Sequence, residues 1–195
     1  MAHSIRTVYV VHHSHTDIGY TDLQERVIDT QAQYIGAVLS LMKQPGYADF
    51  RWNCETLFCV EEFFKTASRE EQDTFCALAA QGKIGLSANY LNFNDLLDCS
   101  VYAHRLQQWR DFFRSRGVAL NTAMFADING ISMGCRDAML DAGVEFLFAN
   151  IHCHHGMYPL YRNQPPSGGN ARRGCWSGTA STITWATSWA SSPTN

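Results

Sequence analysis

The residues best suited to chemistry lie in a short segment rich in histidine, VHHSHTDIGY at residues 11–20. In an extended chain His13, His15 and Asp17 point to one side, because side chains alternate with a period of two. Imidazole nitrogens and carboxylate oxygens together are a ligand set that suits zinc. Loop histidines often only hydrogen-bond to backbone, but three histidines and one aspartate within residues 12–17 favour a metal site.

Three other segments carry polar groups after apolar runs. Asp127 in FADINGIS is either a catalytic carboxylate or a residue of the helix N-cap type. Asp95 in NYLNFNDLLD either contacts substrate hydroxyls or caps the following helix. His154 and His155 in NIHCHH are either metal ligands or substrate contacts.

The elements that must position these groups alternate between strand and helix. Strands are predicted at residues 7–11, 50–54, 83–88, 123–126 and 145–149. Helices are predicted at residues 21–43, from the end of the second strand to residue 64, and at 68–82, 100–116 and 134–142. The pairs Thr21 with Gln24 and Ser68 with Glu71 predict capping boxes. This order predicts an α/β fold with parallel strands and flanking helices, in which functional groups gather at the carboxyl ends of the strands. Five strands are too few to close a barrel, so we expect an open sheet or part of a (β/α)7-type barrel.

Composition narrows the class of protein. The formal charge is −3 and no basic run occurs, which argues against nucleic acid or an anionic membrane as partner. No apolar run is long enough for a membrane span. The seven cysteines form no CxxC pair and the N-terminus has no signal-peptide pattern, so we expect a cytoplasmic protein with free thiols.

The two aspartate-containing motifs resemble those of the family 38 glycoside hydrolases, the retaining α-mannosidases. VHHSHTDIGY is similar to the family's HSHNDPGW, with Thr16, Ile18 and Tyr20 in place of Asn, Pro and Trp. DINGIS is similar to DPFGHS and begins at Asp127. The resemblance covers roughly residues 6–160 and marks a divergent branch.

The resemblance implies a function and a site. His15, Asp17 and Asp127 would bind zinc, and Asp127 would also be the nucleophile that attacks a mannoside-like carbohydrate. Tyr20 would replace the aromatic platform under the sugar ring. The family's fourth zinc ligand and its acid/base aspartate lie further along the chain and have no matching motif here. The resemblance therefore implies an impaired fragment of the N-terminal part of a β/α-barrel domain.

Two other functions fit the residues. A metal-dependent amidohydrolase would use His13, His15 and the later histidine cluster as ligands. This class normally needs a bridging lysine at a middle strand end, and none follows Ala126. A noncatalytic carbohydrate-binding fragment, or one without function, would take up no metal.

The composition changes in the last part of the chain. From Ser167 to Asn195 there is no acidic residue and no Lys, Leu or Val, but there are three Trp. We expect a domain at residues 1–164 and an unstructured tail at 165–195. Suitable codons for the tail, read one base earlier, spell FWWECPKGLLVWNGEHYHLGNELGIVPN, so we expect that a lost base shifted the frame near Pro165 and Pro166.

This expectation is tested on the nucleotide sequence. Restoring one base near the codons for Pro165 and Pro166 should open a long downstream frame that begins with this apolar, strand-like segment. A stop codon soon after the restored base would contradict the shifted frame.

Overall fold

The computed structural model describes residue 10 and residues 12–92, 96–128 and 131–151. Its helices are α1 (Gln24–Met42), α2 (Leu57–Thr66), α3 (Arg69–Ala80), α4 (Cys99–Arg114) and α5 (Met133–Asp141), with a short 3-10 helix η1 (Pro45–Tyr47). The strands are β1 (Trp52–Cys54), β2 (Ile84–Leu86), β3 (Thr122–Ile128) and β4 (Phe146–Ile151). The four predicted strands that fall on described residues are all present, whereas the one at residues 7–11 lies almost wholly outside them.

The strands are short and parallel. β1 pairs with β2, and β3 pairs with β4. Single backbone hydrogen bonds extend this order, because Asn53 N donates to His12 O at 2.7 Å and Ala88 N donates to Thr122 O at 2.7 Å. The segment of His12, β1, β2, β3 and β4 therefore follow one another in space as in sequence. This confirms the mixed α/β class, and the described residues close no barrel.

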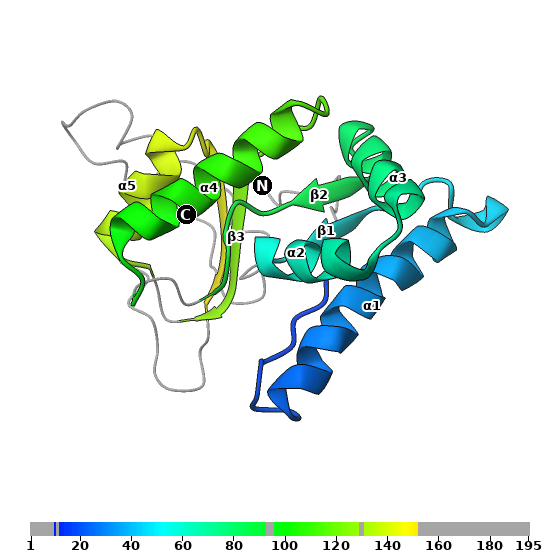
Figure 1. The fold of residues 1–195 in the computed structure, drawn as a ribbon, viewed down its shortest axis with the longest axis horizontal. Coiled ribbons are helices and arrows are strands. Elements are labelled where there is room, and N and C mark those ends of the chain that lie inside the picture. Colours follow the sequence, from blue (N-terminus) through cyan, green and yellow to red (C-terminus); the bar gives the residue numbers. More distant parts are fainter. Residues whose placement is uncertain (1–9, 11, 93–95, 129–130, 152–195) are drawn as a thin grey trace, which may run out of the picture.

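The helices cover the strands and bury an aromatic core. Figure 1 shows α1, α2 and α3 gathered around β1 and β2, with α4 and α5 beside β3 and β4. Phe64 on α2 contacts Phe75 on α3 and both Trp109 and Phe112 on α4, with ring centroids 5.4–6.1 Å apart. Phe113 completes the cluster by stacking on Trp109. Edge-to-face and stacked rings stabilise such a core beyond the burial of their area.

The two predicted capping boxes differ in outcome. Ser68 is the N-cap of α3, and its side chain and that of Glu71 make both reciprocal hydrogen bonds, which confirms this box. The box of Thr21 and Gln24 is wrong, since α1 begins at Gln24 with Leu23 as its N-cap and no side-chain cap bond.

The reason lies in the turn before α1. The hydroxyl of Thr21 donates to Asp17 O at 3.2 Å and so closes that turn instead of capping the helix. Gln24 lies over Gly19, whose φ of +86° only glycine adopts freely. A Cβ at Gly19 would come within 2.7 Å of Gln24 Cγ, so any larger residue at this position would force the Gln24 side chain to move.

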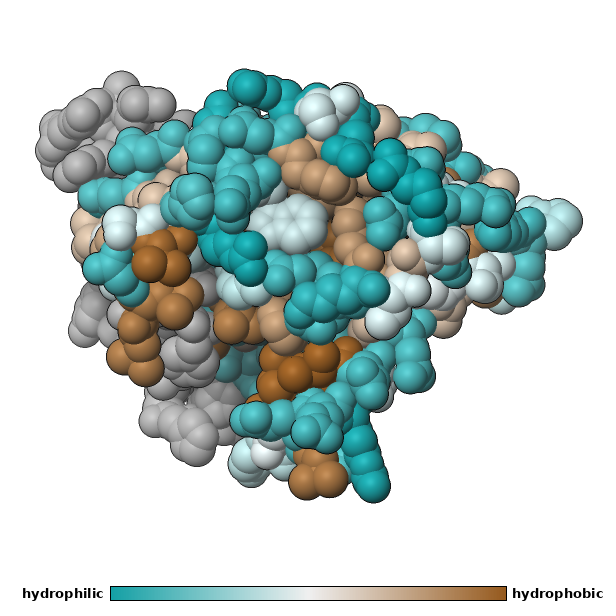
Figure 2. Space-filling model, in the orientation of Figure 1, coloured by the Kyte–Doolittle hydropathy of each residue, from teal (hydrophilic) through white to brown (hydrophobic). Residues whose placement is uncertain are grey.

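The surface is largely hydrophilic on the face shown in Figure 2, with a few compact hydrophobic areas. The exposed apolar side chains include Leu96, Leu97 and Val101 at the start of α4. Among the described helices, none is both long and apolar enough to cross a membrane.

Replacing Ser68 with Ala should lower the free energy of unfolding by about 1 kcal/mol, because the variant loses the cap of α3. Thr21→Ala is the matched control and should change the stability by less than about 0.5 kcal/mol, because Thr21 caps no helix. Urea unfolding followed by circular dichroism measures both. An equal loss in the two variants would contradict the assigned caps.

Candidate metal centre

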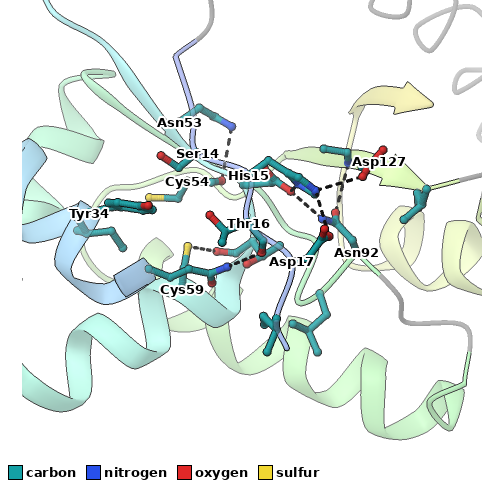
Figure 3. Close-up of a pocket in the computed structure, with 18 of the residues that line it drawn as sticks. Ser14, His15, Thr16, Asp17, Tyr34, Asn53, Cys54, Cys59, Asn92 and Asp127 are labelled. Atoms are coloured by element: carbon teal, nitrogen blue, oxygen red, sulfur yellow. Dashed lines mark hydrogen bonds and ion pairs between the residues drawn. The ribbon is translucent and has the colours of Figure 1, made fainter. Parts of the chain in front are cut away.

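Three of the predicted site residues meet at one edge of the parallel strands. His15 Nε2 lies 3.6 Å from an oxygen of Asp17 and 3.6 Å from an oxygen of Asp127. One ligand atom from each of the three residues lies within 4.8 Å of the other two. The side chains of Asp17 and Asp127 are 43% and 44% exposed, so an ion in solution has access to them. Figure 3 shows His15 directed at Asp127 beside Asp17.

Asp127 reaches this position through an irregularity in β3. The register with β4 shifts between Ala126 and Ile128, as in a β-bulge. Asp127 has a φ of +57°, the only positive value among the described residues other than glycine. Such a conformation costs free energy and occurs often at functional sites. The alternative of a helix N-cap is excluded for α5, since Ser132 caps that helix and accepts from Cys135 N.

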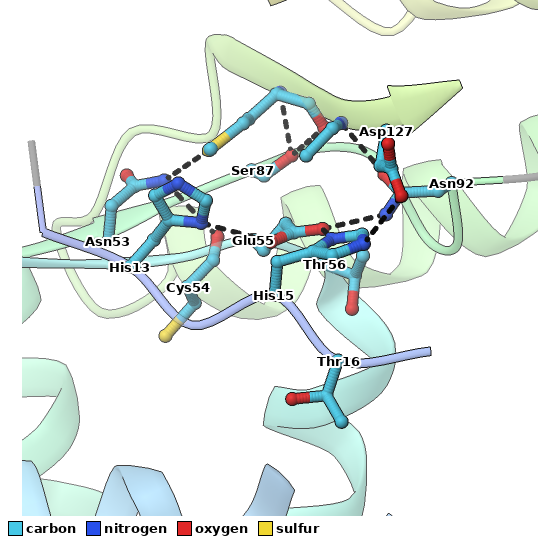
Figure 4. Close-up of polar contacts among 12 residues, drawn as sticks. His13, His15, Thr16, Asn53, Cys54, Glu55, Thr56, Ser87, Asn92 and Asp127 are labelled. Carbon is cyan, nitrogen blue, oxygen red and sulfur yellow. Dashed lines mark hydrogen bonds and ion pairs between the residues drawn. The ribbon is translucent and has the colours of Figure 1, made fainter. Parts of the chain in front are cut away.

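Glu55 is a site residue that the sequence analysis missed. It follows β1 directly, is 7% exposed, and accepts hydrogen bonds from His15 Nδ1 at 2.6 Å and His13 Nδ1 at 3.0 Å (Figure 4). Its place is fixed because the next helix, α2, begins at Leu57, whose N–H donates to Asn89 O at 2.8 Å. The position immediately after a parallel strand was the signal that could have identified it.

Asn92 was also missed, and it connects two strand ends. Its Nδ2 donates to Glu55 Oε1 at 2.7 Å, and its Oδ1 accepts from Ala126 N at 3.3 Å. Asn89 Nδ2 donates to the same Oδ1 at 3.1 Å. A polar bridge thus runs from the end of β1 to the residue before Asp127.

Hydrogen bonds set the protonation of the two central groups. The bond to Glu55 raises the pKa of His15; burial lowers that pKa, and the negative charges of Glu55, Asp17 and Asp127 raise it. Burial alone would raise the pKa of Glu55, but the bonds from His13, His15 and Asn92 outweigh burial and hold it at about 2. Glu55 is therefore ionised throughout the neutral range.

A cavity of about 850 Å³ opens beside these residues. Its charged lining consists of Asp17, Glu55 and Asp127, and neither lysine nor arginine lines it among the described residues. Tyr20 lies at this cavity with 88% of its surface exposed, where an aromatic face is open to a ligand.

The other predicted residues are not part of this group. His13 faces Glu55 and is not among the three residues that share the possible metal position. Asp95, His154 and His155 lie outside the described residues. The cap that was an alternative for Asp95 is made by Asp98, whose side chain accepts from Ser100 N and Val101 N at the start of α4.

Fold and site together define an α/β protein with one imidazole and two carboxylates that could hold a metal ion at the ends of its parallel strands. Residues 6–191 match the family model described as the glycosyl hydrolases family 38 N-terminal domain. The chain belongs to this family, which confirms the resemblance and favours a glycoside hydrolase over the amidohydrolase alternative. No curated protein matches the chain.

The strained backbone at residue 127 predicts an order of stability between two variants that both remove the carboxylate. Asp127→Gly should unfold at a higher urea concentration than Asp127→Ala, by about 1 kcal/mol in free energy, because glycine accepts a positive φ without strain. Both are measured with a chelator present so that metal binding plays no part. Equal or reversed stabilities would contradict the left-handed conformation.

Proposed function

We propose that the chain is the zinc-binding N-terminal part of a retaining glycoside hydrolase that cleaves α-mannosidic bonds. The observation that carries this proposal is the position of His15 Nε2 between the carboxylates of Asp17 and Asp127, at 3.6 Å from each. Membership of glycoside hydrolase family 38 supports the same conclusion.

The charges around His15 fit a bound cation. If Nδ1 carries the proton donated to Glu55, the lone pair of Nε2 faces two carboxylates, and these three groups repel one another. A divalent ion between them turns the repulsion into coordination. One nitrogen and two carboxylate oxygens at a solvent-accessible edge suit zinc and leave a coordination position for another ligand.

The proposed chemistry places Asp127 at the reacting centre. A zinc ion held here would stabilise the ionised carboxylate of Asp127 and could coordinate sugar hydroxyls. Asp127 would attack the anomeric carbon, forming a bond from its carboxylate to the sugar while the glycosidic oxygen leaves with the bonding electrons. Water would then release the sugar with its original configuration. Tyr20 would pack its ring against the apolar face of the sugar.

The general acid of this reaction is not Glu55. A retaining enzyme needs a protonated carboxyl about 5–5.5 Å from the nucleophile. Glu55 is ionised near neutral pH, since its pKa is about 2, and its two oxygens already accept three side-chain hydrogen bonds. Asp17 is assigned to the metal. We therefore propose that the acid, like the fourth zinc ligand, belongs to sequence beyond the matching motifs, and that the chain by itself is impaired.

The finer predictions about organisation belong to the same proposal. The order of the described strands supports part of a (β/α)7-type barrel over residues 1–164. The division at residue 165, the shifted frame of the tail, the sugar contacts of Asp95, His154 and His155, and the cytoplasmic location stay predictions.

Zinc uptake tests the metal site. Calorimetric titration should show one zinc ion bound per chain, and Asp17→Asn should weaken binding at least about tenfold, because a ligand carboxylate becomes a neutral amide. Asp22→Asn is the matched control, since it removes an exposed carboxylate nearby that instead accepts from Leu23 N and pairs with Arg26. An equal effect of the two substitutions, or no uptake by the unaltered chain, would refute the metal site.

The nucleophile is tested with 2,4-dinitrophenyl α-mannoside, whose phenolate leaves without protonation and so needs no general acid. The zinc-loaded chain should release dinitrophenolate and carry a covalently bound mannose on Asp127, located by peptide mass spectrometry. Asp127→Asn should form no adduct. A sugar attached to any other residue, or the same release from Asp127→Asn, would overturn the assignment.

A further inference from the structure

We propose that Glu55 is a positioning residue that selects the metal-binding tautomer of His15 and holds this histidine at a fixed distance from Asp127. This inference deepens the proposed function and rests on it, since the metal would bind at His15.

The first argument is the contact between the two side chains. Glu55 Oε1 lies 2.6 Å from His15 Nδ1, which is a short distance for a hydrogen bond to a carboxylate. A carboxylate only accepts, so the proton of a neutral His15 ring resides on Nδ1. Nε2 is then left with its lone pair directed at the space shared with Asp17 and Asp127.

Glu55 does not coordinate the ion itself. It contacts Nδ1, whereas the two aspartates face Nε2 on the opposite side of the ring. The pattern is carboxylate, histidine, metal, in which the outer carboxylate orients the ring and increases the basicity of the coordinating nitrogen.

The second argument is that Glu55 cannot easily turn away. It is 7% exposed and accepts from three donors, namely His13 on one oxygen and His15 and Asn92 on the other. Figure 4 shows the carboxylate between these side chains. Rotation would break all three hydrogen bonds and leave the buried carboxylate of Glu55 without its donors, which is costly.

The third argument is the link to the nucleophile strand. Asn92 accepts from Ala126 N while it donates to Glu55. One carboxylate is thus connected to His15 on one side and, through a single amide, to the residue that precedes Asp127. This chain of hydrogen bonds sets the distance between His15 and Asp127, two proposed ligands that lie far apart in the sequence.

The test compares Glu55→Gln with Glu61→Gln. Glutamine keeps the shape of residue 55, but it has only one acceptor oxygen for three donors. Its NH₂ group takes the place of the second oxygen and faces donors that it cannot accept from. Glu61→Gln is the matched control because Glu61 is a partly buried acid on α2 that pairs with Arg105 and Tyr90. Glu61 does not line the cavity.

Two measurements are made on each folded chain. Competition with a chromophoric chelator should show zinc affinity 10- to 100-fold weaker in Glu55→Gln and unchanged in Glu61→Gln. In the metal-free protein, at a pH where the imidazole is neutral, long-range ¹H–¹⁵N spectra should show His15 protonated on Nδ1 in the unaltered chain and shifted towards Nε2 protonation in Glu55→Gln. A merely structural role would not move this tautomer.

The outcomes separate this inference from the proposed function. If Glu55→Gln keeps both the zinc affinity and the His15 tautomer, the positioning role is wrong although the metal site stands. If the unaltered chain binds no zinc, the proposed function fails. The comparison of the His15 tautomer between the unaltered chain and Glu55→Gln then tests by itself whether Glu55 selects that tautomer. Should Glu55→Gln not fold, Glu55→Asp, which retracts the carboxylate by one methylene, takes its place with the same expected losses.

Discussion

The site depends on one electrostatic constraint, the concentration of three carboxylates around one imidazole ring. Glu55 is satisfied by donors and is stable as an anion in its buried place. Asp17 and Asp127 share a space with His15 Nε2, which lies 3.6 Å from an oxygen of each. No lysine or arginine lines the described part of the cavity, so the proposed cation would balance this negative charge.

The scaffold accounts for how residues so far apart in sequence share this space. Parallel strands deliver every carboxyl end to the same edge, so the segments after β1 and β2 supply Glu55 and Asn92, and the last residues of β3 supply Asp127. The aromatic cluster of α2, α3 and α4 packs away from that edge and stabilises the layer of helices. The residues that stabilise the fold and the candidate site residues therefore lie in different parts of the structure, as is common in α/β proteins.

For the proposed retaining mechanism, the described residues supply one part of what the reaction requires. They bring together a candidate nucleophile and two further candidate ligands, while the only other acid that lines the described cavity, Glu55, is held as an anion. In the proposed function, metal binding and proton transfer to the leaving group fall to different residues, and the second task belongs to residues outside this group.

The sequence by itself determined the alternation of strands and helices, the box of Ser68 and Glu71, and the candidates His15 and Asp17, because periodicity, capping and ligand chemistry are local properties. Asp127 alone was either a catalytic carboxylate or a helix cap, and the resemblance to the family motif made it a candidate ligand. The sequence did not determine which groups meet. Glu55 and Asn92 read as ordinary residues at the start of a helix and in a loop, and the positive φ of Asp127 has no signal in the residue type alone. Even the local pattern at Thr21 was overruled by its bond to Asp17 O. Only the tertiary structure decided the places of Glu55 and Asn92, since hydrogen bonds between residues 34 to 42 positions apart depend on how the strands are placed side by side.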